Sequence, residues 1–335
     1  MNEIFDSLNE EYHFHTFSKG ITGCFWVLNH AKKNNLISMN LKSLDFYNKF
    51  LKNSMITEIK NDNYDFLHGA IGIGLYLLEK SKNKSIYNYI GKLIDCLYEI
   101  KETENTGFKW YSLINSETEL YGYNLSLSHG SSSIICFLSK VHSKGFFQEK
   151  TKILLDGAIE YILKNGTKNK EDFLYPSWVP KDNSYSTSRL AWCYGDLGIA
   201  IALYYAGVST NNNDLINKSI ENLTHTSNRR DLIKENVLDA CLCHGTAGIA
   251  HIYKRMYRNT GIEKFKETHD FWINETLKMA KFKDGLAGYK KYQGLDSGEW
   301  RTEYGFLDGI AGIGLTLLSS ISDEDPSWDE CLLLS

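Results

Sequence analysis

The chain has 335 residues, enough for one large domain or two ordinary ones with a substantial buried core. Its composition is 42% hydrophobic and 23% charged, with a formal net charge of −4, so no basic excess indicates nucleic-acid binding. The N-terminal sequence lacks the features of a signal peptide, and no apolar run approaches the ~20 residues that span a bilayer. We therefore expect a cytoplasmic protein without direct membrane insertion.

A glycine motif recurs six times along the chain. Each copy has two residues before a first glycine, then two further residues, and a second glycine that is replaced only in the third copy, by Ser133. In chain order the copies are Ser18-Lys19-Gly20-Ile21-Thr22-Gly23, Leu67-His68-Gly69-Ala70-Ile71-Gly72, Ser128-His129-Gly130-Ser131-Ser132-Ser133, Cys193-Tyr194-Gly195-Asp196-Leu197-Gly198, Cys243-His244-Gly245-Thr246-Ala247-Gly248 and Leu307-Asp308-Gly309-Ile310-Ala311-Gly312. The first glycines are 49 to 65 residues apart, and each interval fits two helices with their connections.

Each motif opens an apolar segment, which predicts an inner helix packed on several sides. Amphipathic stretches lie between the motifs; in 151–163, the apolar residues from Leu154 to Leu163 fall on one stripe, as in an outer helix. The polar stretches 164–188 and 281–305 predict irregular loops. Six hairpins in register indicate an all-α fold, either a solenoid or a closed α/α toroid, and no composition shift divides 1–335 into domains.

The two residues before each first glycine should lie at one level of such a repeat. Cys193 and Cys243 occupy the same motif position, and His244 follows directly, so we expect the three side chains to lie close together. Two thiolates and an imidazole suit Zn²⁺, and three protein ligands leave a fourth position open, as in catalytic zinc sites. Cys241 lies outside the register but could compete as a ligand. The seven cysteines, an odd number, are otherwise expected to be buried thiols.

These motifs resemble the lanthionine synthetase C-like cyclases. The resemblance runs from about residue 18 to the C-terminus and rests on the WCYG segment at 192–195, the CHG segment at 243–245, the LSHG segment at 127–130 and the GxxG repeats. It implies a double-layered α/α toroid in a single domain, with one catalytic zinc. The implied reaction adds a cysteine thiol of a dehydrated precursor peptide to dehydroalanine or dehydrobutyrine, which closes a thioether ring.

The resemblance also implies roles for individual residues. Cys193, Cys243 and His244 match the zinc ligands, and the matching catalytic positions are His129, Asp65, Arg189 and Tyr194. His129 could protonate the enolate that thiol addition creates, and Arg189 could stabilise its charge. Asp65 could orient a histidine or receive the thiol proton. A dehydratase and a transporter are the expected partners, through which the protein could be peripheral at the inner membrane.

Simpler interpretations remain open at several positions. Asp65 could cap the following helix, and Asp308 is most simply a cap for the last inner helix. His68 is expected to pack or to support the site, and Arg189 could pair with a surface carboxylate.

The chain shows six motifs where the family has seven hairpins. We therefore expect either that one N-terminal hairpin is missing or that the sequence continues upstream of Met1. Two other functions stay open. One is a non-catalytic, zinc-containing scaffold that binds thiol peptides or glutathione, and the other is a prenyltransferase-like zinc toroid acting on peptide thiols.

Overall fold

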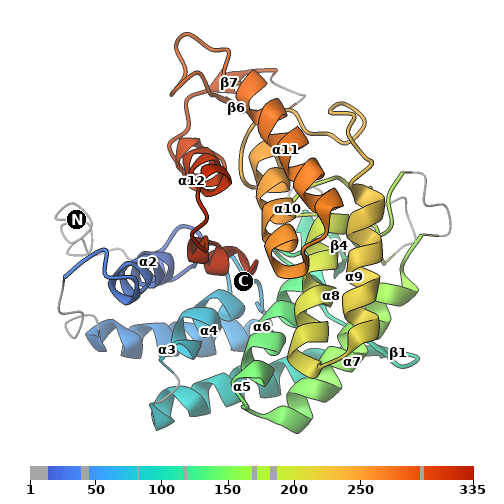
Figure 1. Cartoon of the computed structure of the whole chain (residues 1–335). Helices are drawn as coiled ribbons and strands as arrows, with labels where there is room; N and C mark the ends of the chain where they lie inside the picture. The colour runs from blue at the N-terminus through green and yellow to red at the C-terminus, as the bar shows by residue number, and fades with distance from the viewer. Residues whose placement is uncertain are drawn as a thin grey trace. The chain divides into compact units, whose positions relative to one another are not determined.

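The computed structural model describes residues 14–38, 45–80, 83–115, 119–167, 172–181, 187–294 and 298–335. The chain forms two compact units: Met1–Tyr111 with Ser128–Tyr161, and Ser112–Leu127 with Ile162–Ser335 (Figure 1). None of the helices within the described ranges combines the length and hydrophobicity that crossing a bilayer requires.

In the first unit, three helices begin directly after a motif glycine: α2 (Ile21–Lys33), α4 (Ala70–Leu78) and α6 (Ser131–Ser143). Between them in sequence are α3 (Asp45–Lys60) and α5 (Lys84–Ile100), and α7 (Gln148–Lys164) follows α6. All nine residues of α4 are buried, because it contacts α2 and α6 as well as α3 and α5. The buried residues of α5, by contrast, follow one helical stripe from Ile86 to Leu97, as expected of an outer helix.

The second unit repeats this plan. Helices α8 (Asp196–Thr210), α10 (Thr246–Thr260) and α12 (Ile310–Ile321) begin after motif glycines, and α9 (Asn213–Thr226) and α11 (Glu263–Lys278) pack against α8 and α10 respectively (Figure 1). A 3₁₀ helix, η2 (Ser327–Leu332), ends the chain. Its Asp329 is fully buried and accepts hydrogen bonds from His251 and Arg255 of α10, which fixes the C-terminal segment to that helix.

Short strands interrupt the helices and were not predicted. A hairpin of β1 (Glu102–Glu104) and β2 (Gly107–Lys109) follows α5. A three-stranded sheet in the order β3-β4-β5 uses Tyr111–Asn115, Leu120–Asn124 and Trp178–Pro180. Strands β6 (Lys291–Tyr292) and β7 (Trp300–Arg301) pair antiparallel. The two polar stretches therefore contain paired strands as well as loops, since β5 lies in the first and β6 and β7 lie in the second.

Backbone hydrogen bonds join successive motifs at the residue two positions before the first glycine. In the first unit, the Ser18 N–H donates to the Leu67 carbonyl at 3.0 Å. In the second, the Cys193 N–H donates to the Cys243 carbonyl at 3.3 Å, and the Cys243 N–H donates to the Leu307 carbonyl at 2.8 Å. These bonds connect equivalent positions of neighbouring copies, so within each unit the repeat register read from the sequence is also the spatial register.

Close packing explains the second glycine of the motif. A Cβ on Gly312 would overlap the carbonyl oxygen of Phe306, six residues earlier, and would lie 2.9 Å from the Cβ of Leu242, just before the preceding motif. Gly198 repeats the pattern, with Leu127 Cβ at 2.7 Å from the added atom. The second glycine thus allows each inner helix to approach the chain segment that precedes the neighbouring motif.

Substitution of Gly312 by alanine should therefore destabilise the fold. We expect the free energy of unfolding to fall by about 1–3 kcal/mol, because a methyl group must displace backbone atoms that cannot move cheaply. Gly314, two residues later in α12, is a matched control, since a Cβ there meets nothing within 4 Å. Gly314→Ala should be neutral or stabilise by up to about 1 kcal/mol through helix propensity. Urea denaturation of both variants measures the difference, and equal effects would contradict this packing account.

Candidate functional site

Cys193, Cys243 and His244 come together in the second unit. The two cysteines immediately precede the turns into α8 and α10, and the backbone bond between Cys193 and Cys243 holds their main chains side by side. The two sulfurs and a ring nitrogen of His244 all lie within 4.8 Å of one another. The structure thus brings together the three side chains that the motif register predicts to be neighbours.

The electrostatics of Cys193 set it apart from the other buried thiols. Burial raises the pKa of Cys96 to about 11 and that of Cys136 to about 12, as expected for thiols in apolar surroundings. The pKa of Cys193 is instead held well below its usual value, chiefly because the Cys243 thiol donates a hydrogen bond to it, with His244 and the Arg189 charge contributing. The neighbouring thiolate in turn raises the pKa of Cys243. Deprotonation of Cys193 thus disfavours deprotonation of Cys243.

The donor chemistry of this group fits a zinc ion. Two sulfurs and one imidazole nitrogen form a Cys₂His set, and only 5% of the Cys193 surface is exposed. A second set, Asp239, Cys241 and His244, also lies within 4.8 Å and shares the histidine. In that set, Asp239 already accepts the backbone N–H groups of Cys241 and Tyr292, and the Cys241 sulfur accepts that of His244. The existing partners of Asp239 and Cys241 favour the Cys₂His set.

Asp239 was missed by the sequence reasoning. Asp239 is 2% exposed. Burial is the largest influence on the pKa of His244 and lowers it, but Cys193 and, to a smaller extent, the charge of Asp239 raise it. The spacing of an aspartate two residues before Cys241 and four before Cys243 was the available signal. A carboxylate beside a ligating histidine is a recurrent feature of zinc sites, where it fixes the orientation of the ring.

Arg189 and Tyr194 lie on either side of Cys193 in the chain. The Nη2 of Arg189 donates to the Asn236 carbonyl at 2.8 Å, and its positive charge is close enough to lower the pKa values of Cys193 and His244. The turn after Tyr194 requires glycine at position 195. Gly195 has a φ of +94°, and a side chain there would overlap the Arg189 carbonyl. The ring of Tyr194 meets that of Trp178 edge to face, with centroids 6.3 Å apart.

His129 and Asp65 form a hydrogen-bonded pair in the first unit. His129 Nδ1 is 2.6 Å from Asp65 Oδ2, and their side chains are 26% and 20% exposed. The other oxygen, Oδ1, accepts the His68 backbone N–H at 2.7 Å. Because α4 has Gly69 as its N-cap and no side-chain cap, Asp65 does not cap that helix. Its contacts are those of a residue that orients the imidazole.

Asp308 does not cap α12, so that expectation was wrong. The N-cap of α12 is Gly309, without a side-chain hydrogen bond, and Asp308 Oδ2 instead accepts from Lys291 Nζ at 2.6 Å. The lysine lies in β6, a strand that the sequence did not predict, and an ion pair with a cation is a stronger interaction for a carboxylate than a neutral backbone donor.

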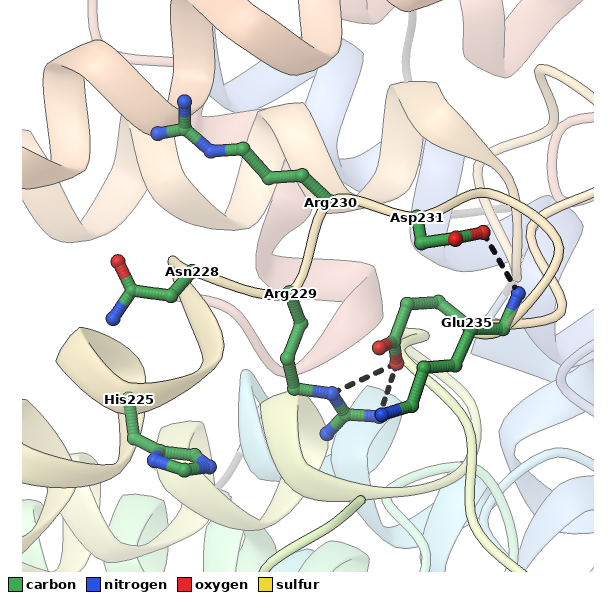
Figure 2. Close-up of a pocket in the computed structure, with 7 residues that line it drawn as sticks. His225, Asn228, Arg229, Arg230, Asp231 and Glu235 are labelled. Atoms are coloured by element: carbon green, nitrogen blue, oxygen red, sulfur yellow. Dashed lines mark hydrogen bonds and ion pairs between the residues drawn. The ribbon is translucent and has the colours of Figure 1, made fainter. Parts of the chain in front are cut away.

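The second unit also contains a cavity of about 600 Å³, which is not lined by Cys193, Cys243 or His244. It is lined by residues between His225 and Glu235, none of which is a predicted site residue (Figure 2). In Figure 2 the guanidinium of Arg229 faces the carboxylate of Glu235, with which it pairs, and Arg229 also binds the buried Asp196 at 2.5 Å. These ion pairs join the loop after α9 to the start of α8, which is a structural role.

The chain is similar in sequence and fold to known proteins. Residues 1–333 match the family described as Lanthionine synthetase C-like protein. The nisin biosynthesis protein NisC of Lactococcus lactis subsp. lactis is 26% identical, over 90% of this chain and 72% of its own length. A solved nisin cyclase superposes with a TM-score of 0.80 at 22% identity, covering 99% of this chain and 83% of that one. A D-mannose isomerase has a TM-score of 0.50 at 12% identity, covering 79% and 71% of the two chains.

The structural likeness to the nisin cyclase confirms the predicted fold class, an α/α toroid built from helical hairpins. The family match covers both units, and with them all seven predicted site residues. The chain therefore belongs to the lanthionine synthetase C-like protein family.

Proposed function

We propose that this protein is a zinc-dependent lanthipeptide cyclase. It would add cysteine thiols of a dehydrated precursor peptide to dehydroalanine or dehydrobutyrine, forming lanthionine or methyllanthionine thioether rings. The observation that carries the proposal is that Cys193 and Cys243, at equivalent motif positions, lie together with His244. Family membership and the likeness to a protein named nisin cyclase support cyclase activity.

In this proposal Cys193, Cys243 and His244 are the protein ligands of one Zn²⁺. A bound zinc would act as a Lewis acid that lowers the pKa of the substrate thiol. Three protein ligands would leave the fourth coordination position open for that thiol. The protein's own contribution begins with the ligand set. The Cys243 thiol, the His244 ring and the Arg189 charge hold the pKa of Cys193 below its usual value, which favours the thiolate form that a metal binds.

The remaining residues act on the carbon atoms of the substrate. The substrate thiol first loses its proton to water. When the sulfur then attacks the β-carbon of the alkene, a carbon–sulfur bond forms, the π bond between the α- and β-carbons breaks, and its electron pair moves to the carbonyl oxygen as an enolate. Arg189 would stabilise this negative charge. His129, oriented through its Nδ1 by Asp65, would deliver a proton to the α-carbon from its Nε2. The short Asp65–His129 bond favours the orienting role of Asp65 over that of thiol base. Tyr194 would contact the substrate near Cys193.

We further propose that the two units work as one domain. One family match runs through both units, which supports a single domain over residues 1–335. A dehydratase and a transporter as partners, a cytoplasmic location and a missing N-terminal hairpin stay predictions from the sequence.

A direct test combines metal analysis with a thiol assay. The purified protein is incubated with synthetic peptides that carry one cysteine and one dehydroalanine at varied spacing. We expect about one zinc per chain and loss of free thiol without any change in peptide mass, because cyclisation is an isomerisation. Zinc without thiol loss would favour the thiol-binding scaffold. Prenylation would instead add mass when an isoprenoid diphosphate is supplied. Absence of zinc from protein refolded with the metal would contradict all three.

A further inference from the structure

His68 lies beside His129 in the first unit, at the equivalent position of the preceding motif. The two rings are stacked, with centroids 5.6 Å apart and planes inclined by 19°. His68 Nδ1 is 3.1 Å from the Ser18 hydroxyl oxygen, so three successive motifs contribute to the cluster. The His68 backbone N–H also holds Oδ1 of Asp65, whose Oδ2 binds His129. His68 therefore touches His129 with its ring and the orienting carboxylate with its main chain.

The surroundings of His68 lower the pKa of its ring. Burial is the largest influence and lowers its pKa; Asp65 acts in the opposite direction, and the charges of His129 and Lys19 lower the pKa further. Two imidazolium ions in a stack would also repel each other. The side-chain hydrogen bond of Asp65 goes to His129, so the carboxylate stabilises a positive charge on the His129 ring most directly.

We propose that His68 is a positioning residue for His129: its ring stacks against the His129 imidazole and limits the movement of that ring. Asp65 fixes one edge of the His129 ring and His68 fixes its face, which leaves the ring one orientation from which to protonate the substrate. This inference rests on the proposed role of His129 as proton donor. The stacking and the electrostatic coupling of the two rings can be tested without any substrate.

NMR titration of protein labelled with ¹⁵N-histidine tests the pair directly. His129→Asn should raise the pKa of His68, because a neighbouring positive charge is removed, and Asp65→Asn should lower it, because an attracting negative charge is lost. His142→Asn is the matched control, since His142 lies in the last turn of α6 in the same unit and should leave the pKa of His68 where it was. If neither His129→Asn nor Asp65→Asn moves the pKa of His68, the proposed pair does not exist.

Kinetics with a peptide substrate test the positioning role. His68→Ala should lower kcat by about 10- to 100-fold, because the His129 ring loses the contact on its face. His68→Phe keeps a flat ring and should recover most of that loss, with zinc content and KM unchanged in both variants. His68→Lys places a lasting positive charge beside His129 and should shift the alkaline limb of the kcat profile, where His129 loses its proton, to lower pH. Equal activity of the alanine and phenylalanine variants would overturn the proposal. Absence of thiol loss in the unsubstituted protein would instead reject the cyclase function, while the titration would still decide whether the pair exists.

Discussion

Replacement of Cys243 by alanine should remove both the zinc and the cyclisation activity. The substitution leaves only Cys193 and His244 of the ligand set. Loss of a residue that supports a ligand lowers metal affinity by up to about 100-fold, so loss of a ligand itself should lower the affinity for zinc by at least that factor. A Lewis acid contributes several kcal/mol of transition-state stabilisation. At a factor of ten per 1.4 kcal/mol, kcat/KM should fall by about 10³-fold or more. Metal analysis and the free-thiol assay on the same preparation measure both quantities.

Two further cysteine variants make this result specific. Cys136→Ala also removes a buried thiol, one in α6 that has no part in the proposed site, and should retain zinc and activity. Cys241→Ala distinguishes the two donor sets, because Cys241 belongs only to the one that includes Asp239. Zinc retained in Cys241→Ala and lost in Cys243→Ala supports the Cys₂His set. The reverse pattern would assign the metal to Asp239, Cys241 and His244.

The repeat made the ligand group predictable from sequence. Equivalent residues of neighbouring motifs are joined by a backbone hydrogen bond, as between Cys193 and Cys243, so a shared motif position translates into spatial proximity. The pairing of Asp65 with His129 could not be read in the same way. Asp65 lies four residues before its motif glycine, outside the register, and which of several possible partners it binds depends on how neighbouring turns pack.

Some features were not predicted from the sequence or were predicted wrongly. They depend on contacts between segments that lie outside the repeated motif. Strands β1 to β4 are three to five residues long and pair with one another, and such short strands owe their stability to partners more than to local sequence preference. The cap expected at Asp308 failed because Lys291, from a strand seventeen residues earlier, supplies a charged partner. Asp239 was overlooked because it lies outside the motif register, and its spacing to Cys241 and Cys243 was the one local signal of its proximity to His244.

Replacement of His129 by asparagine should separate protonation from metal binding. Asparagine keeps a polar side chain but cannot donate a proton at neutral pH as an imidazolium does, so we expect kcat to fall by about 10²- to 10⁴-fold, the usual contribution of general acid–base catalysis. The zinc content should not change, because His129 is absent from the ligand set. Thiol loss at saturating peptide, together with metal analysis, measures the two effects separately.

Asp65→Asn should lower kcat less than His129→Asn, because it removes the orientation of the ring and leaves the proton donor in place. If the two residues act as a unit, the double variant should be no slower than His129→Asn alone, since an orienting carboxylate has nothing to orient once the imidazole is gone. Losses that multiply in the double variant would show that Asp65 acts independently, for example as the acceptor of the thiol proton. Full activity of His129→Asn would transfer the proton donation to another group. The double variant therefore decides between the two roles of Asp65 that the sequence left open, and it does so through the energetics of the pair.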